Sequence, residues 1–180
     1  MHRLFVALRP PAAIRTVLHA IIGGVPHARW QDDDQLHLTM RFIGDVTSAL
    51  GEDIAATLGH VGGGAIEARL NGVGRFDKHG RTNAIWAGVS PHDALTRLHN
   101  KVDRALAAVG VPPEGRAYLP HITLARLPRT AGVEPDVARF LADHAALASP
   151  PFTLSHLTLF ESQLTREGAR YDVVGRWPLG

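Results

Sequence analysis

The chain has 180 residues, of which 45% are hydrophobic and 20% are charged, and its formal net charge is +2. This composition is typical of a globular protein that can bury a proper core, so we expect one domain with two lobes across residues 1–180. The chain has no cysteine, which excludes disulfides, thiolate catalysis and cysteine metal sites. The small positive charge permits a phosphate-bearing ligand without requiring a surface that coats nucleic acid.

The N-terminal region does not resemble a targeting or membrane segment. The apolar run Leu4–Leu8 is too short for a signal-peptide core, and Arg9-Pro10-Pro11 ends it. No stretch approaches the roughly 20 apolar residues of a membrane span. We therefore expect a soluble, cytoplasmic monomer with no membrane partner.

The first elements in chain order are a buried strand, Arg3–Leu8, and a helix that Pro10-Pro11 opens and Gly23-Gly24 ends. Helical apolar spacing predicts further helices from Thr47 or Ser48 to Leu58, and at Asp93–Val109 and Pro135–Ala146. Strand patterns appear at Leu36–Ile43 (closed by Gly44), Ile66–Leu70, Asn83–Val89, Tyr118–Leu127, Phe152–Ser162 and Tyr171–Trp177. Polar composition predicts loops at Gly72–Arg81 and Gln163–Arg170.

This order of strands and helices indicates an α+β protein with mixed or antiparallel sheets. The two halves of the chain are alike, because each places a helix, a strand, another helix and further strands in the same order. Such internal pseudo-symmetry favours two related lobes, and ligands commonly bind in the cleft between lobes.

A four-residue pattern occurs twice, once in each half, as His37-Leu38-Thr39-Met40 and His121-Ile122-Thr123-Leu124. Residues two apart on a strand point to the same face, so each copy places an imidazole beside a hydroxyl. Two copies that face each other would form a site with two histidines and two threonines. We predict that His37, Thr39, His121 and Thr123 are the catalytic residues.

Five further residues are candidates for substrate binding. Arg41 shares strand parity with His37 and can offset phosphate charge. Arg126 has the opposite parity to His121 unless the strand bulges. Phe42, Phe76 and Tyr118 are candidates for stacking on a base, although a place in the core is the commoner role for phenylalanines such as Phe42 and Phe76.

The two motifs, in their frame, resemble those of the 2H phosphoesterase superfamily and specifically the RNA 2′,3′-cyclic phosphodiesterases, also called 2′-5′ RNA ligases. The likeness extends along the chain through Arg3–Leu8, Leu36–Gly44, Ile85–Val89, Pro120–Arg126, Leu157–Ser162 and Ala169–Tyr171. It implies a bilobal, mostly antiparallel fold with helices outside and both motifs in a central cleft. It also implies an enzyme that needs no metal or nucleotide cofactor, with RNA 2′,3′-cyclic-phosphate ends or cyclic nucleotides as substrates.

The resemblance further implies a product with a 2′-phosphate, so that the P–O3′ bond breaks. One histidine acts as base towards water and the other as acid towards the leaving oxygen, which suits imidazoles with a pKa near 6.5. The threonine hydroxyls would donate hydrogen bonds to the non-bridging phosphate oxygens. By resemblance we assign His37 as proton donor and His121 as proton acceptor.

Three other functions stay open on the sequence. One is a 2′-5′ ligase, or a phosphodiesterase for another cyclic phosphate or for a 2′-5′ linkage. A second is a non-catalytic RNA-binding module, which the intact motifs argue against. A third is a metallohydrolase that uses the histidines as ligands. The acidic run Asp32–Asp34 fits a solvated loop better than a metal site, because its spacing matches no familiar set of ligands.

Overall fold

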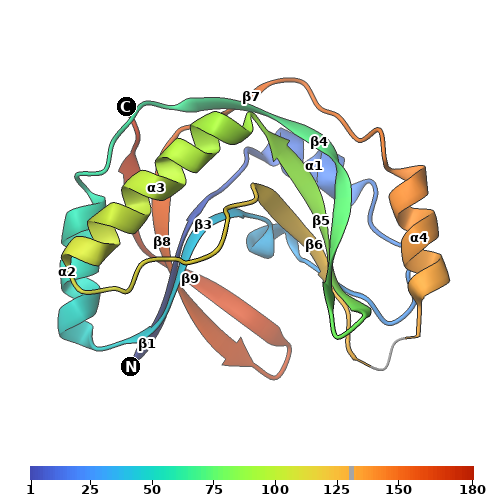
Figure 1. Cartoon of the computed structure of the whole chain (residues 1–180), viewed down its shortest axis with the longest axis horizontal. Coiled ribbons are helices and arrows are strands. Elements are labelled where there is room, and N and C mark those ends of the chain that lie inside the picture. The colour runs from blue at the N-terminus through green and yellow to red at the C-terminus, as the bar shows by residue number, and fades with distance from the viewer. Residues whose placement is uncertain (130–131) are drawn as a thin grey trace.

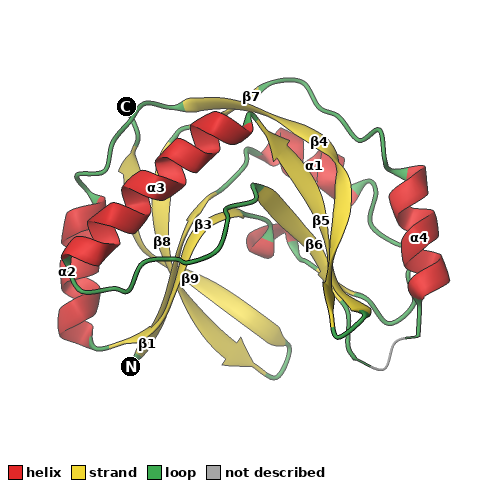
Figure 2. Cartoon of the chain, viewed as in Figure 1, coloured by secondary structure: helices red, strands yellow, loops and turns green. Residues whose placement is uncertain are grey.

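A computed structural model describes residues 1–129 and 132–180 of the chain. The helices are α1 (Ala12–His19), α2 (Ser48–Leu58), α3 (His92–Ala108) and α4 (Glu134–Asp143), and a short 3-10 helix, η1, covers Asp33–Gln35. The strands are β1 (His2–Leu8), β2 (Arg29–Trp30), β3 (Leu38–Val46), β4 (Ile66–Lys78), β5 (Arg81–Ser90), β6 (His121–Arg126), β7 (Phe152–Leu154), β8 (His156–Thr165) and β9 (Gly168–Pro178). Figures 1 and 2 show the helices on the outer side of the strands.

The strands follow one path in the order β7-β4-β5-β6-β3-β1-β8-β9, with β2 beside β6, and the neighbours pair antiparallel. The predicted α+β class is therefore confirmed. The two expected sheets are joined instead of separate, because β3 and β6 pair at one position, Leu38 with Ile122. The two halves of the path diverge from this junction (Figure 1).

The helices form where apolar spacing predicts them. The Thr47 hydroxyl caps α2 by accepting a hydrogen bond from the backbone N–H of Leu50, which decides between the two caps, Thr47 and Ser48, that the sequence leaves open. Helix α3 buries its apolar stripe and lies beside both α2 and β3. Because one core cluster contains residues from β1, β3, β5 and β6, both halves of the sheet share a single hydrophobic core.

The opposite face of the first half of the sheet carries a separate, small aromatic cluster. Phe5, Ala7 and Phe160 are buried there, and Tyr171 packs against them. Strand alternation explains the division, because Leu4 and Val6 of β1 point into the main core while Phe5 and Ala7 point away from it. We call the side of the sheet that carries Phe5 the motif face, because His37 packs against Phe5 there.

The predicted loop at Gly72–Arg81 is wrong, because β4 and β5 form one long hairpin through this stretch. Its turn is His79-Gly80, both with positive φ (53° and 75°), which is the geometry that two-residue hairpins favour. The glycines that suggested a loop serve the strand. Gly72 lies at a bulge, and the Trp86 indole covers Gly74 so closely that a Cβ would lie 2.3 Å from the ring.

The predicted loop at Gln163–Arg170 is also wrong, because β8 and β9 continue to a tight turn between Thr165 and Gly168. The predicted strand Phe152–Ser162 is divided at Ser155, since β7 pairs with β4 and β8 pairs with β1. Strand β3 does not close at Gly44. It continues to Val46, and Gly44 has a φ of 87° beside an irregularity in the pairing with β1.

Candidate active site

The two motif strands pair at the residue that lies between the histidine and the threonine of each motif. Leu38 and Ile122 pair across the junction, and both side chains are buried in the core. The histidine and threonine that flank each of them therefore project from the other face. Because the pairing is antiparallel, the register places His37 towards Thr123, and Thr39 towards His121. The fold thus brings together the four residues that the repeated pattern singles out.

Each motif imidazole has a backbone carbonyl beside it from the residue two positions earlier. Nδ1 of His121 lies 2.7 Å from the backbone oxygen of Leu119 and donates to it in the matching tautomer. The carbonyl of Gln35 acts on the pKa of His37 in the same sense as that of Leu119 acts on the pKa of His121, because each favours the protonated imidazole. Among the described residues, Nε2 of His121 has no hydrogen-bond partner, so this nitrogen is free to accept or donate a proton.

Aromatic rings surround both histidines. The centroid of His37 lies 4.9 Å from that of Phe5 and 5.4 Å from that of Tyr171, which presents its edge. The centroid of His121 lies 4.9 Å from Phe76, also edge-on, and 6.0 Å from Trp86. Both histidines are half-buried against these rings, and this partial removal from water disfavours their charged forms.

Burial accordingly lowers the pKa of both histidines. The pKa of His37 falls from 6.5 to about 4, chiefly through desolvation and further through the positive charges of Arg126 and His121. The pKa of His121 is also lowered by burial and by Arg126. The charge of Arg126 therefore lowers the pKa of both imidazoles.

The prediction that Arg41 points towards the substrate is wrong. Strand β3 has one extra residue between Thr39, which pairs with Ala7, and Arg41, which pairs with Val6. This bulge reverses the strand alternation, so Arg41 turns into the protein and is only 7% exposed. Its Nε donates to Oδ1 of Asp103 over 2.9 Å, and Arg41 also donates to the backbone oxygens of Phe42 and Pro112.

A matching bulge gives Arg126 the opposite outcome. Strand β6 has one extra residue between Thr123, which pairs with Trp86, and Ala125, which pairs with Ile85. The bulge returns Arg126 to the face that carries His121, and its side chain is exposed. From the sequence, Arg126 could share a face with His121 only if the strand bulges, and the structure has this bulge.

The three aromatic candidates occupy different environments. Phe42 is 58% exposed and lies on the motif face, with its ring centroid 5.9 Å from that of Phe5. Phe76 belongs to β4 and packs against His121. The assignment of Tyr118 to the substrate is wrong, because its hydroxyl donates to the backbone oxygen of Thr39 over 2.9 Å. Its ring stacks on His99 at 4.3 Å, and burial raises the pKa of this phenol.

Sequence patterns missed three residues that contact the site. Phe5 and Tyr171 contact His37, and the backbone carbonyl of Gln35 favours its protonated form and so raises its pKa. Strand alternation predicts only that Phe5 faces away from Leu4 and Val6. Nothing in the local pattern brings Tyr171, at the far end of the chain, to His37.

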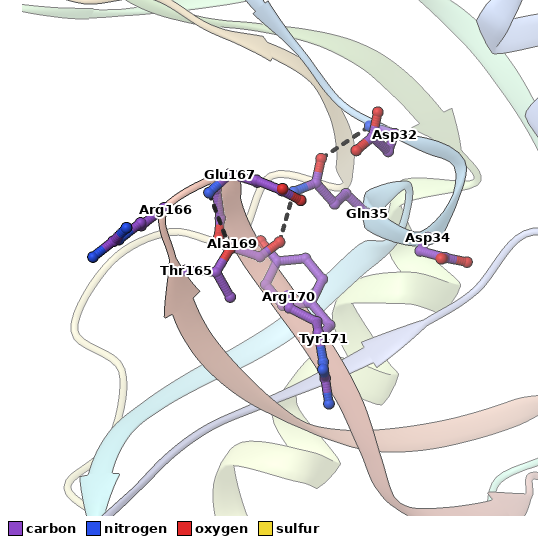
Figure 3. Close-up of a pocket in the computed structure, with 10 residues that line it drawn as sticks. Asp32, Asp34, Gln35, Thr165, Arg166, Glu167, Ala169, Arg170 and Tyr171 are labelled. Atoms are coloured by element: carbon purple, nitrogen blue, oxygen red, sulfur yellow. Dashed lines mark hydrogen bonds between the residues drawn. The ribbon is translucent and has the colours of Figure 1, made fainter.

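A pocket of about 510 Å³ opens between η1 and the tip of the β8–β9 hairpin (Figure 3). Tyr171 belongs to both this pocket and the surroundings of His37. The remaining lining is polar and carries both signs of charge: Asp32, Asp34, Gln35, Thr165, Arg166, Glu167, Gly168, Ala169 and Arg170. The described ranges, 1–129 and 132–180, contain no group of three or more histidine or acidic side chains placed to hold a metal ion.

The family model of the 2′-5′ RNA ligase superfamily matches residues 10–166 of the chain. The protein therefore belongs to this superfamily, which confirms the resemblance seen in its two motifs. An RNA 2′,3′-cyclic phosphodiesterase of Aeropyrum pernix is 30% identical over 152 residues, which cover 84% of this chain and 85% of the relative. The Escherichia coli protein of the same name is 27% identical over 186 residues, which cover 98% and 96%.

Solved structures show the same architecture. Escherichia coli LigT in complex with 3′-AMP superimposes with a TM-score of 0.75 at 26% identity, covering 99% of this chain and 98% of LigT. A Thermus thermophilus protein superimposes with a TM-score of 0.78 at 23% identity, covering 98% and 97%, and thus shares the fold. In the described part of this chain, no helix has the length and apolar character needed to span a membrane.

Proposed function

We propose that the protein hydrolyses RNA 2′,3′-cyclic phosphate ends to 2′-phosphomonoesters, with His37 and His121 as acid and base. The observation that carries the proposal is the equivalent placement of the two imidazoles. They lie on either side of the single pairing between Leu38 and Ile122, and in each motif the carbonyl two residues before the histidine favours the protonated imidazole and so raises its pKa. The names of the relatives, RNA 2′,3′-cyclic phosphodiesterases, point to the same substrate class.

In the proposed step, His121 accepts a proton from water while the water oxygen bonds to phosphorus. The bond between phosphorus and O3′ breaks, and His37 gives O3′ its proton. The products are a 2′-phosphomonoester and a free 3′-hydroxyl. An in-line displacement needs the base and the acid on opposite sides of phosphorus, and two histidines from two strands meet that need.

The proton on His37 has to arrive with the substrate. At pH 7 a group with a pKa of about 4 is neutral in the free protein. The negative charge of the cyclic phosphate favours the imidazolium form and raises this pKa when the substrate binds. The acceptor, His121, is already neutral in the free protein, since burial lowers its pKa as well.

The other residues of this face suit the remaining parts of a nucleotide. Thr39 and Thr123 can donate hydroxyl hydrogen bonds to the non-bridging oxygens, and Arg126 can offset the developing charge. Phe42 exposes an aromatic surface on the same face and can stack on a base. Phe76, which packs edge-on against His121, supports that ring.

The test uses an oligoribonucleotide that ends in a 2′,3′-cyclic phosphate, incubated with the protein in EDTA and without ATP. We expect turnover to a 2′-phosphate, identified by ³¹P NMR, and none with the doubly substituted variant His37→Ala/His121→Ala. No turnover by the wild-type protein would contradict the proposal, and a 3′-phosphate product would mean that the other P–O bond breaks. Activity that appears only when a divalent metal replaces EDTA would support the metallohydrolase interpretation instead.

A further inference from the structure

Gln35 lies two residues before the first motif histidine, and two side-chain hydrogen bonds tie it to its surroundings. Its backbone carbonyl favours the protonated His37 imidazole and so raises its pKa. Its side-chain Nε2 donates to the backbone oxygen of Ala169 over 2.8 Å, and its Oε1 accepts from the backbone N–H of Asp32 over 2.9 Å (Figure 3). The side chain is therefore fixed at both polar atoms, between η1 and the β8–β9 hairpin.

The hairpin segment that Gln35 holds extends beyond the main sheet. Strand β8 pairs with β1 from Thr158 to Glu161, and past that point the hairpin pairs with itself up to its turn. Within the described residues, the 2.8 Å bond from Gln35 is the one side-chain hydrogen bond that joins the hairpin tip to the rest of the protein. Figure 1 shows the hairpin projecting away from the other strands.

Two residues after Ala169, the hairpin places Tyr171 against the site. The Tyr171 ring is edge-on to His37 at an interplanar angle of 84° and lies 4.9 Å from Phe5. The second motif has no such dependence. His121 packs against Phe76 of β4, which pairs with Ala84 of β5, and against Trp86 of β5, which is paired on both sides.

We propose that Gln35 is a positioning residue, which holds the β8–β9 hairpin so that Tyr171 encloses His37 and fixes the orientation of its imidazole. The catalytic part of this inference rests on the proposed function. The structural part, in which the hairpin controls the environment of His37, stands on the contacts alone. Loss of the tether would let the hairpin tip move and admit water to His37 while leaving His121 undisturbed.

The charged and titratable groups that face His37 define what a titration would report. Arg126 and His121 approach from β6, Arg9 follows β1, and Tyr171 comes from β9. None of them changes when Gln35 is replaced by an uncharged residue of similar length. A change in the pKa of His37 then reports altered access of water to its imidazole, because desolvation is the largest influence on this pKa.

The experiment compares Gln35→Met with wild type by NMR titration of the histidine side chains and by steady-state kinetics. Methionine keeps the length of the side chain and removes both of its hydrogen bonds. We expect the His37 titration to move upward from about 4 towards 6.5, with His121 unchanged. We also expect kcat to fall roughly tenfold with KM within about twofold of wild type, because orientation affects the transition state more than binding.

A second variant and a control keep the test decisive. Tyr171→Leu removes the enclosing ring directly and should raise the His37 titration in the same way. Ser149→Ala removes another side-chain bond to the backbone, the 3.0 Å bond from the N–H of Leu70, and should change neither titration nor kcat. Wild-type His37 titration and kcat in Gln35→Met, or an equal shift of His121, would overturn the proposal. The titrations need no turnover, so their result is independent of whether the wild-type protein hydrolyses a cyclic phosphate.

Discussion

The two motif strands are near copies that place different residues on the motif face. Each has a bulge after its threonine, so the fifth residue after the histidine, and not the fourth, returns to the side of that histidine. In β3 that residue is Phe42, and in β6 it is Arg126. The repeated backbone thus supplies an aromatic surface from one half and a cation from the other, so a symmetric frame carries an asymmetric site.

The two motif strands also differ in the group that donates a hydrogen bond to the backbone oxygen at the bulge. The backbone oxygen of Met40 lies 2.7 Å from Nδ1 of His99 on α3, whereas the equivalent oxygen of Leu124 accepts from the backbone N–H of Gln31 at 2.8 Å. A buried carbonyl must find a donor, and the two halves find different ones. The bulged backbone of the first motif strand is therefore held by a side chain, that of His99. The bulged backbone of the second is held by the main chain of Gln31, which follows β2.

The largest expected effect concerns the two histidines. His37→Ala and His121→Ala should each lower kcat by about 10²- to 10⁴-fold, because each removes one proton transfer. A substrate in which sulfur replaces O3′ distinguishes their roles, since a thiolate leaves without being protonated. We expect this substrate to restore much of the activity of His37→Ala and little of that of His121→Ala. The reverse result would exchange the acid and the base.

Arg41 tests the buried side of the comparison. Arg41→Met should lower the free energy of unfolding by about 3 kcal/mol, because it leaves the largely buried carboxylate of Asp103 without its charge partner. Urea denaturation measures this change. Adding Asp103→Asn should recover part of the loss, since it removes the unpaired charge. Equal stability of Arg41→Met and wild type would contradict the buried pairing.

Arg126 tests the exposed side. Arg126→Met should lower kcat/KM by about 10²-fold, as expected when one stabilising donor to a developing anion is lost. The free energy of unfolding should stay within about 0.5 kcal/mol of wild type, because the side chain is exposed. The two arginine variants thus separate catalysis from stability. A loss of activity in Arg41→Met equal to that in Arg126→Met, at a temperature where both are folded, would remove the distinction.

The smallest effect is a dependence of stability on pH. The folded pKa of His37 is lowered from 6.5 to about 4, so between these values the unfolded chain binds a proton that the folded chain does not. Stability from this group is complete above pH 6.5 and is lost as the pH falls towards 4. His37→Gln should flatten this decline, measured by urea unfolding at pH 7 and pH 5. An unchanged slope would show that His37 is not desolvated as the structure has it.

Sequence patterns predict the class of the fold, which the structure confirms, and they single out the four motif residues that the structure brings together. Helical and strand periodicity indicate which side chains are buried. The histidine and threonine of each His-x-Thr motif are two residues apart, so strand alternation alone places them on one face. The sequence also limited the N-cap of α2 to Thr47 or Ser48, since capping depends on neighbouring residues.

Features that depend on contacts between distant segments could not be predicted from such short-range patterns. Strand parity failed at Arg41 because a bulge depends on the partner strand, and sequence periodicity carries no record of the partner. Tyr118 was expected to contact the substrate, but its hydroxyl donates to the backbone carbonyl of Thr39, which needs a donor at the junction of β3 and β6. The contact of Tyr171 with His37 required the hairpin from the far end of the chain, which local patterns cannot place.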